Sequence, residues 1–257
     1  MLNFNHKKVL ITGASSGLGA ALALALGKKG AHLALVARRQ AKLKALANQI
    51  NQAGGQAQVF PCDVANYQQV QTTYRQIKNK VGDIDLAFLN AGIGSQVLTQ
   101  NLSVKEAKKV INTNYFGVLH WLEPLLKQMQ PQNKGIIAIT SSLASYRGLP
   151  GSGSYAASKA ALAALIESCQ IDLLATNIKL VLVMPYFMIT EMSGLDQPRN
   201  LKIWSSAEKA AHVIISGIAK GKQEIIFPWH FHLFMYFMKI IPLPVYRLFW
   251  KIIKRGG

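Results

Sequence analysis

Acidic residues and cysteines are scarce in this sequence. Against 29 Lys and Arg it has only 11 Asp and Glu, a formal net charge of +18, and the first carboxylate is Asp63. Half of the 257 residues are apolar and 16% are charged, a composition that excludes intrinsic disorder and allows a large buried core. The two cysteines, Cys62 and Cys169, exclude both a disulfide framework and a cysteine-rich zinc site.

Targeting and metal-binding signals are also missing. The first residues, MLNFNHKK, lack the apolar core of a signal peptide, so we expect a cytoplasmic protein with reduced cysteines. The histidines are not spaced as ligand pairs on a helix face. His230 and His232 could share a strand face, but no acid or cysteine is near them, and we expect no metal site.

The excess of positive charge favours anionic partners. Nucleotide phosphates, anionic lipid or an acidic carrier protein would each suit it, and a solvated basic surface without a specific partner is the alternative. The lysines are scattered and no nucleic-acid-binding motif accompanies them, so we expect no nucleic acid partner.

Short β-branched runs alternate with helical stretches along most of the chain. Strands are expected at residues 9–12, 33–37, 58–60, 85–90, 135–141 and 179–184. This alternation is typical of a single α/β domain of Rossmann type, a doubly wound parallel sheet with helices on both faces. The length suits one such domain.

The alternation stops near residue 225, which divides the chain into a catalytic domain, 1–227, and an apolar, basic C-terminal extension, 228–257. The last 33 residues are rich in aromatics and contain five Lys or Arg and no acid. The longest uncharged run, 225–238, is shorter than the ~20 residues of a spanning helix. We expect the extension to lie on an anionic membrane surface, peripheral at the inner face, or else to pack on the domain or a partner subunit.

A glycine-rich turn follows the first expected strand. It reads Thr12-Gly13-Ala14-Ser15-Ser16-Gly17-Leu18-Gly19. Between a strand and a helix, such glycines let the backbone approach a pyrophosphate, whose charge the helix N-terminus stabilises. The sequence therefore predicts a dinucleotide site here.

The end of the second expected strand indicates which dinucleotide binds. Ala37-Arg38-Arg39 stand where an NAD site carries an acid for the ribose hydroxyls. A guanidinium can instead pair with a 2′-phosphate. We therefore expect NADP(H) to be preferred over NAD(H), with Arg38 as the phosphate contact.

Ser142, Tyr155 and Lys159 form the constellation that carries chemistry. Tyr155 and Lys159 are four residues apart on an expected helix, so they share one face. A nearby ammonium would lower the phenol pKa towards neutrality and make the tyrosine a usable acid or base.

With these motifs the chain resembles the short-chain dehydrogenase/reductase family over residues 7 to about 227. The resemblance implies a catalytic set of Asn114, Ser142, Tyr155 and Lys159. It implies that the cofactor contacts are Gly13, Ser15, Ser16, Gly17, Leu18, Gly19, Arg38, Asp63, Val64, Asn90, Ala91, Gly92, Tyr155, Lys159, Pro185 and Thr190. Tyr186 departs from the family, which usually has glycine at this position, and we expect it to narrow the space beside the nicotinamide.

The resemblance implies hydride transfer between NADP(H) and a carbonyl or alcohol. Ser142 would bond the carbonyl oxygen, Tyr155 would protonate it, Lys159 would hold the nicotinamide ribose, and Asn114 would anchor a water. Apolar residues between 186 and 204, with the extension, favour a hydrophobic or lipidic substrate. The alternatives are a soluble 3-oxoacyl carrier-protein reductase and a non-catalytic NADP-binding sensor. The resemblance also implies a homodimer that pairs through the helices of Asn114 and Tyr155.

Overall fold

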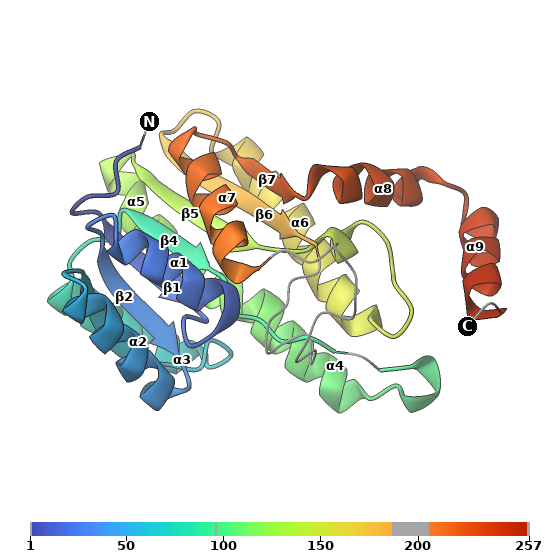
Figure 1. Ribbon diagram of the computed structural model, residues 1–257, viewed down its shortest axis with the longest axis horizontal. Coiled ribbons are helices and arrows are strands. Elements are labelled where there is room, and N and C mark those ends of the chain that lie inside the picture. The colour runs from blue at the N-terminus through green and yellow to red at the C-terminus, as the bar shows by residue number, and fades with distance from the viewer. Residues whose placement is uncertain (1, 96, 187–205, 256–257) are drawn as a thin grey trace.

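The computed structural model describes residues 2–95, 97–186 and 206–255, and its centre is a parallel sheet (Figure 1). The strand order is β3-β2-β1-β4-β5-β6-β7, and all neighbours run parallel. The strands are β1 (Lys8–Thr12), β2 (His32–Ala37), β3 (Gln56–Pro61), β4 (Leu86–Leu89), β5 (Gly135–Thr140), β6 (Ile178–Pro185) and β7 (Glu224–Phe227). The predicted Rossmann-type α/β fold is confirmed.

The last strand, β7, was not predicted. It has four residues and pairs with the end of β6, from Leu182 opposite Glu224 to Pro185 opposite Phe227. Its sequence, EIIF, is too short to be separated from the apolar residues that follow it. Only its pairing with β6 identifies it as part of the sheet.

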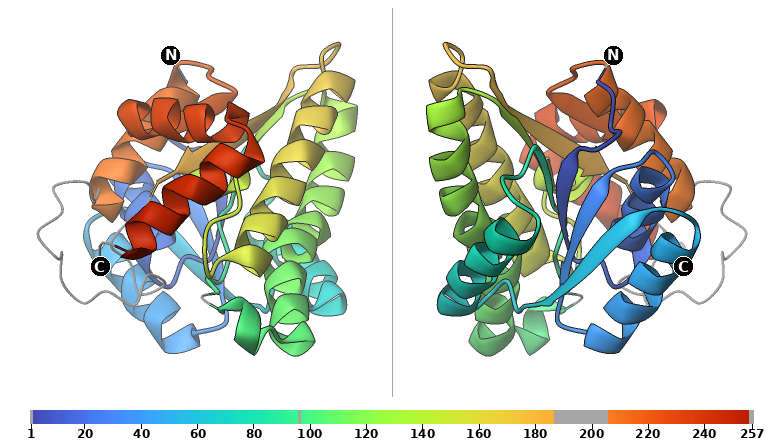
Figure 2. Two further views of the ribbon diagram at one scale, coloured as in Figure 1. Left: turned by 90° about the vertical axis from the view of Figure 1, so that its right-hand side faces the viewer. Right: turned by 90° about the vertical axis from the view of Figure 1, so that its left-hand side faces the viewer.

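Helices cover both faces of the sheet (Figure 2). One apolar core lies between the sheet and α1, α2 and α7, and the other lies between the sheet and α3, α5 and α6. The α-helices are α1 (Gly17–Gly27), α2 (Gln40–Gln52), α3 (Tyr67–Lys80), α4 (Val104–Ile111), α5 (Gly117–Gln132), α6 (Gly153–Asp172), α7 (Ala207–Ala219), α8 (Trp229–Ile240) and α9 (Leu243–Arg255). The shorter turns are η1 (Thr99–Asn101), the π-helical η2 (Asn112–Phe116) and η3 (Leu143–Ser145).

Burial on both faces explains why the central strands are apolar throughout. All four residues of β4 and the last four residues of β1 are buried, as expected for parallel strands covered by helices. The chain leaves β1 towards β2 on one side, whereas β4 lies on the other side. Such a reversal of strand order opens a crevice at the carboxyl ends of the strands, where ligands bind in this type of fold.

Candidate active site

The glycine turn after β1 is closely packed backbone. Gly13 has a φ of +68°, and a Cβ added there would lie 2.9 Å from Cα of Ala91. A Cβ on Gly19 would lie 2.3 Å from the Gly13 carbonyl oxygen. These positions need glycine because a side chain would collide with neighbouring backbone atoms where the turn leads into α1. The residues present therefore fit a pyrophosphate group.

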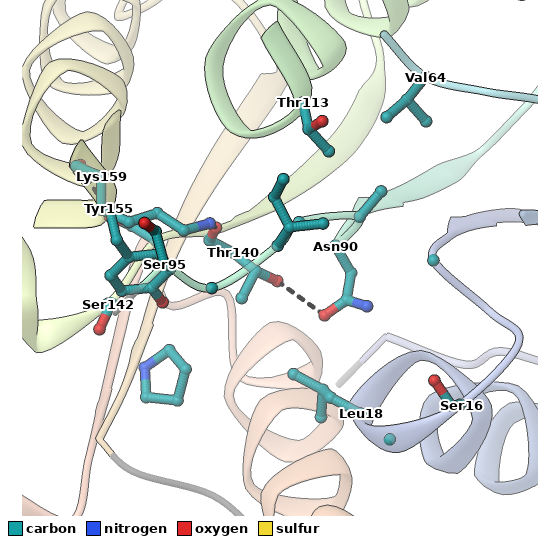
Figure 3. A pocket seen from close by; sticks show the side chains of 18 of the residues that line it. Ser16, Leu18, Val64, Asn90, Ser95, Thr113, Thr140, Ser142, Tyr155 and Lys159 are labelled. Carbon is teal, nitrogen blue, oxygen red and sulfur yellow. Dashed lines mark hydrogen bonds between the residues drawn. The ribbon is translucent and has the colours of Figure 1, made fainter. Parts of the chain in front are cut away.

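Thr12 connects the turn to the end of β4. Its Oγ1 accepts hydrogen bonds from the backbone N–H of Asn90 at 3.0 Å and of Ala91 at 3.1 Å, and donates to the Phe88 carbonyl at 3.3 Å. Oγ1 of Thr140, at the end of β5, donates to Oδ1 of Asn90 at 3.3 Å (Figure 3). The ends of three neighbouring strands are thereby held in one arrangement.

Asn114 lies buried in the π-helical turn η2. Its Oδ1 accepts from the Ile93 N–H at 2.8 Å, and its Nδ2 donates to the Ile93 carbonyl at 3.0 Å and to Oγ of Ser158 at 3.1 Å. The side chain thus ties the loop after β4 to α6, which carries Tyr155 and Lys159. π-helical turns recur at functional sites, and this one turns Asn114 inwards.

Ser142, Tyr155 and Lys159 lie close together at one end of a cavity (Figure 3). Ser142 caps η3, and its Oγ accepts from the Ala144 N–H at 3.1 Å. Nζ of Lys159 donates to the Thr140 carbonyl at 2.7 Å and lies 5.9 Å from the centre of the Tyr155 ring. The end of β5 and one face of α6 thus bring Ser142 close to Tyr155, 13 residues later, and to Lys159, four residues further on.

The pKa values correct one expectation. Burial raises the pKa of Tyr155 above its usual value, and a hydrogen bond with Ser142 lowers it by a smaller amount. Burial lowers the pKa of Lys159 to about 8. This raised pKa runs against the expectation of a phenol pKa lowered towards neutrality, because burial of the phenol has the largest effect on it.

The burial of Lys159 makes stability depend on pH. Its pKa falls from 10.5 in the unfolded chain to about 8 in the fold, so its charged form costs stability below pH 8, and this cost disappears as the pH rises to 10.5. The difference corresponds to about 3 kcal/mol. Below pH 8 we expect Lys159→Met to have a higher free energy of unfolding than the wild type. This difference should disappear as the pH rises to 10.5, and urea unfolding measures it. Lys80→Met, at an exposed position, is the control, and parallel pH curves for Lys159→Met and wild type would contradict the expectation.

The cavity at the strand ends has a volume of about 560 Å³. Among the described residues predicted to contact the cofactor, all but Gly19 line it, and Gly19 lies behind the turn, against Gly13. Thr190 lies outside the described residues, as does the predicted substrate segment after Tyr186. The structure thus brings the predicted cofactor residues and Ser142, Tyr155 and Lys159 to one cavity, with Asn114 behind it.

Both arginines after β2 border the cavity. Nη1 of Arg38 lies 4.0 Å from Oδ2 of Asp63, and both side chains are largely exposed. Arg39 donates from Nε and Nη2 to Oγ of Ser15 at 3.0 and 2.9 Å, and from Nη2 to Oγ of Ser16 at 2.5 Å. Sequence reasoning missed this contact of Arg39 with the glycine turn, although the strand-to-helix position of the Arg pair pointed to it.

The C-terminal extension supplies part of the cavity wall, which the sequence did not indicate. Met235 of α8 is buried and lines the cavity beside Tyr186. The Tyr186 ring stacks on Phe231 of α8, with the ring centres 4.1 Å apart. The tyrosine that replaces the usual glycine therefore attaches α8 to the end of β6.

The described residues contain neither a metal-binding cluster nor a membrane-spanning helix. In the ranges 2–95, 97–186 and 206–255, no three His, Cys, Asp or Glu side chains gather where they could hold a metal ion. Over the same part of the chain, no helix is both long and apolar enough to cross a membrane.

Comparisons with known proteins agree with this geometry. The family model for the short chain dehydrogenase matches residues 7–200. An uncharacterized oxidoreductase of Myxococcus xanthus is 30% identical over 246 residues, which cover 96% of this chain and 97% of that protein.

Two solved structures are similar to this chain. One is a short chain dehydrogenase/reductase from Burkholderia phymatum in complex with NAD, with a TM-score of 0.82 and 27% identity, covering 88% of this chain and 90% of that one. The other is an alcohol dehydrogenase from Thermococcus sibiricus complexed with 5-hydroxy-NADP, with a TM-score of 0.79 and 28% identity, covering 86% and 95%. The protein thus belongs to the short-chain dehydrogenase family and is an oxidoreductase that acts on hydroxyl or keto groups.

Proposed function

We propose that this protein is an NADP(H)-dependent reductase of apolar carbonyl compounds. The observation that carries the proposal is the shared cavity, in which Ser142, Tyr155 and Lys159 lie at one end and the glycine turn and Arg38 border the rest. When bound, the dinucleotide supplies the hydride, and the protein supplies alignment and a proton.

Each residue of the site has a defined part in this proposal. Ser142 holds the carbonyl oxygen, and the Tyr155 hydroxyl donates the proton that reduction requires. Lys159 holds the nicotinamide ribose. The three hydrogen bonds of the Asn114 side chain support a positioning role, and the water that Asn114 would anchor stays a prediction.

The residues around Ser142 favour an apolar substrate. Ala144 and Leu149, in the segment between Ser142 and Tyr155, line the cavity together with Tyr186 and Met235. These side chains can contact the hydrocarbon part of a substrate, while Ser142 and Tyr155 contact its carbonyl group. A sensor without turnover would have no use for Ser142 and Tyr155 side by side in the cavity wall, which argues for an enzyme.

Arg38 is the residue proposed to select NADP(H). Its ion pair with Asp63, at 4.0 Å and in an exposed position, contributes at most about 1 kcal/mol, so the guanidinium can turn to a 2′-phosphate at little cost. Hydrogen bonds to charged groups contribute about 1.5–3 kcal/mol, which corresponds to a preference of about 10- to 100-fold.

The test measures kcat/KM with NADPH and with NADH on ketones of increasing chain length. We expect NADPH to be preferred, turnover to rise with chain length, and Arg38→Leu to lower the NADPH to NADH ratio about 10- to 100-fold. Arg75→Leu, at an exposed site on α3, is the matched control. A larger effect of Arg39→Leu would assign the phosphate to Arg39, and equal use of both cofactors by the wild type would refute the preference.

A further inference from the structure

The C-terminal helix pair, α8 and α9, has one packed side and one exposed side. On α8, Met235 and Met238 are buried while Trp229, Leu233 and Phe237 are more than half exposed. Along α9, Tyr246 is buried, whereas the exposed apolar side chains are Leu243, Val245, Leu248, Ile252 and Ile253. This many exposed apolar side chains on two consecutive helices of a folded protein indicate an interaction site.

Side-chain contacts from the segment between Ser142 and Tyr155 attach the pair to the catalytic domain. Nη1 of Arg147 donates to the carbonyls of Lys239 at 3.0 Å and Ile241 at 3.2 Å, and its guanidinium lies 4.6 Å from the centre of the Tyr246 ring. Oη of Tyr246 donates to the Gly148 carbonyl at 2.6 Å. Arg147 and Gly148 lie between Ser142 and Tyr155, so α8 and α9 are attached to the rim of the cavity.

The charges around this surface have one sign. Arg247 and Lys251 are exposed on α9, and the sequence contains no acid after Glu224. Lys239 of α8 lies towards the catalytic domain, with Nζ 5.3 Å from the centre of the Tyr146 ring. On α9, Arg247 and Lys251 are four residues apart and share one side, whereas Val245, Leu248 and Ile252 share the adjacent side. Cations beside an exposed apolar stripe are the arrangement that suits anionic lipid headgroups above a hydrocarbon layer.

A second copy of the chain fits this surface less well. Each copy carries a net charge of +18, so two of these basic surfaces brought together would repel one another. An anionic bilayer complements both the apolar side chains and the lysine and arginine side chains.

We propose that the exposed side of α8 and α9 docks on an anionic membrane surface. Figure 1 shows α8 and α9 projecting from the sheet, and Figure 2 shows α9 lying across the outside of the molecule. The docking is interfacial, since neither helix reaches the length of a membrane span. Because Met235 lines the cavity from the buried side of α8, the docked helix separates the bilayer from the active site by its own width. This proposal does not depend on the proposed reaction.

The test is sedimentation of the full-length protein with phosphatidylcholine vesicles that contain or lack phosphatidylglycerol. Leu248→Asp/Ile252→Asp adds two charges to the exposed side of α9, and Ile171→Asp/Leu174→Asp adds the same two charges at exposed apolar positions at the end of α6. Point substitutions are used because removal of α8 would open the cavity at Met235. All four positions are exposed, so thermal unfolding should stay unchanged.

We expect the wild type to sediment with the anionic vesicles and not with phosphatidylcholine alone. The α9 variant should lose at least about 10-fold in vesicle affinity, since each buried aliphatic side chain contributes about 1.5–3 kcal/mol, and the α6 variant should keep it. Failure of the wild type to sediment, or an equal loss in both variants, would overturn the proposal. A dimer that dissociates only in the α9 variant, without vesicle binding, would assign the surface to a second copy.

Discussion

Tyr155→Phe should reduce kcat/KM for carbonyl reduction by about 10²- to 10⁴-fold, the usual contribution of a general acid. The variant removes one oxygen from a side chain that is already largely surrounded by protein, so the cavity keeps its shape. The affinity for NADPH, measured by fluorescence titration, should therefore change little. Loss of turnover together with retained binding identifies the hydroxyl as the proton donor.

The matched control for this variant is Tyr67→Phe. The hydroxyl of Tyr67 donates to Glu123 at 3.0 Å on the exposed surface of α3 and α5, outside the cavity. Removing it should leave turnover unchanged. If Tyr155→Phe retained wild-type turnover, the proton would come from another group, and the assignment of Tyr155 would be wrong.

Gly19→Ala should weaken NADPH binding by at least about 10-fold and lower the free energy of unfolding by about 1–3 kcal/mol. The added Cβ would meet the Gly13 carbonyl oxygen at 2.3 Å. Because that atom belongs to the backbone of the glycine turn, the turn itself must shift, and its N–H groups would lose their alignment with the pyrophosphate. Titration with NADPH and urea unfolding measure the two effects.

Gly153→Ala is the control for this substitution. Gly153 is the first residue of α6, and a Cβ there has nothing within 4 Å. Alanine at this site should leave NADPH affinity intact and stabilise the helix slightly. Similar binding losses in Gly19→Ala and Gly153→Ala would show that the close approach at Gly19 does not position the cofactor.

The local sequence predicted the parts of the fold that repeat a periodic pattern. Apolar, β-branched runs predicted β1 to β6 to within a few residues at each end, and the central strands among them are apolar because they are buried on both faces. The short β7 was missed, since four residues carry no period of their own. Its place in the sheet depends on pairing with β6, 42 positions away at Leu182 and Glu224.

The sequence predicted least about the contacts of the C-terminal extension. Its composition indicated a surface or interface element, but the composition does not say that Phe231 stacks on Tyr186 or that Met235 reaches the cavity. Tyr186 looked like an isolated departure from the family. In the structure it stacks on Phe231 of α8, which lies beyond the residues that the family model matches.

By itself, the sequence determined the fold class and the glycine turn, because each depends on residue type at short spacing, and the family resemblance implied the residues of the candidate active site. Only the tertiary structure decided the burial that raises the pKa of Tyr155, the contact of Arg39 with Ser15 and Ser16, and the attachment of α8 and α9 through Arg147. A pKa depends on burial and on where a neighbouring charge is directed, and both are set by side chains from distant segments. For that reason the spacing of Lys159 and Tyr155 alone did not predict the pKa of the phenol, on which burial has the largest effect.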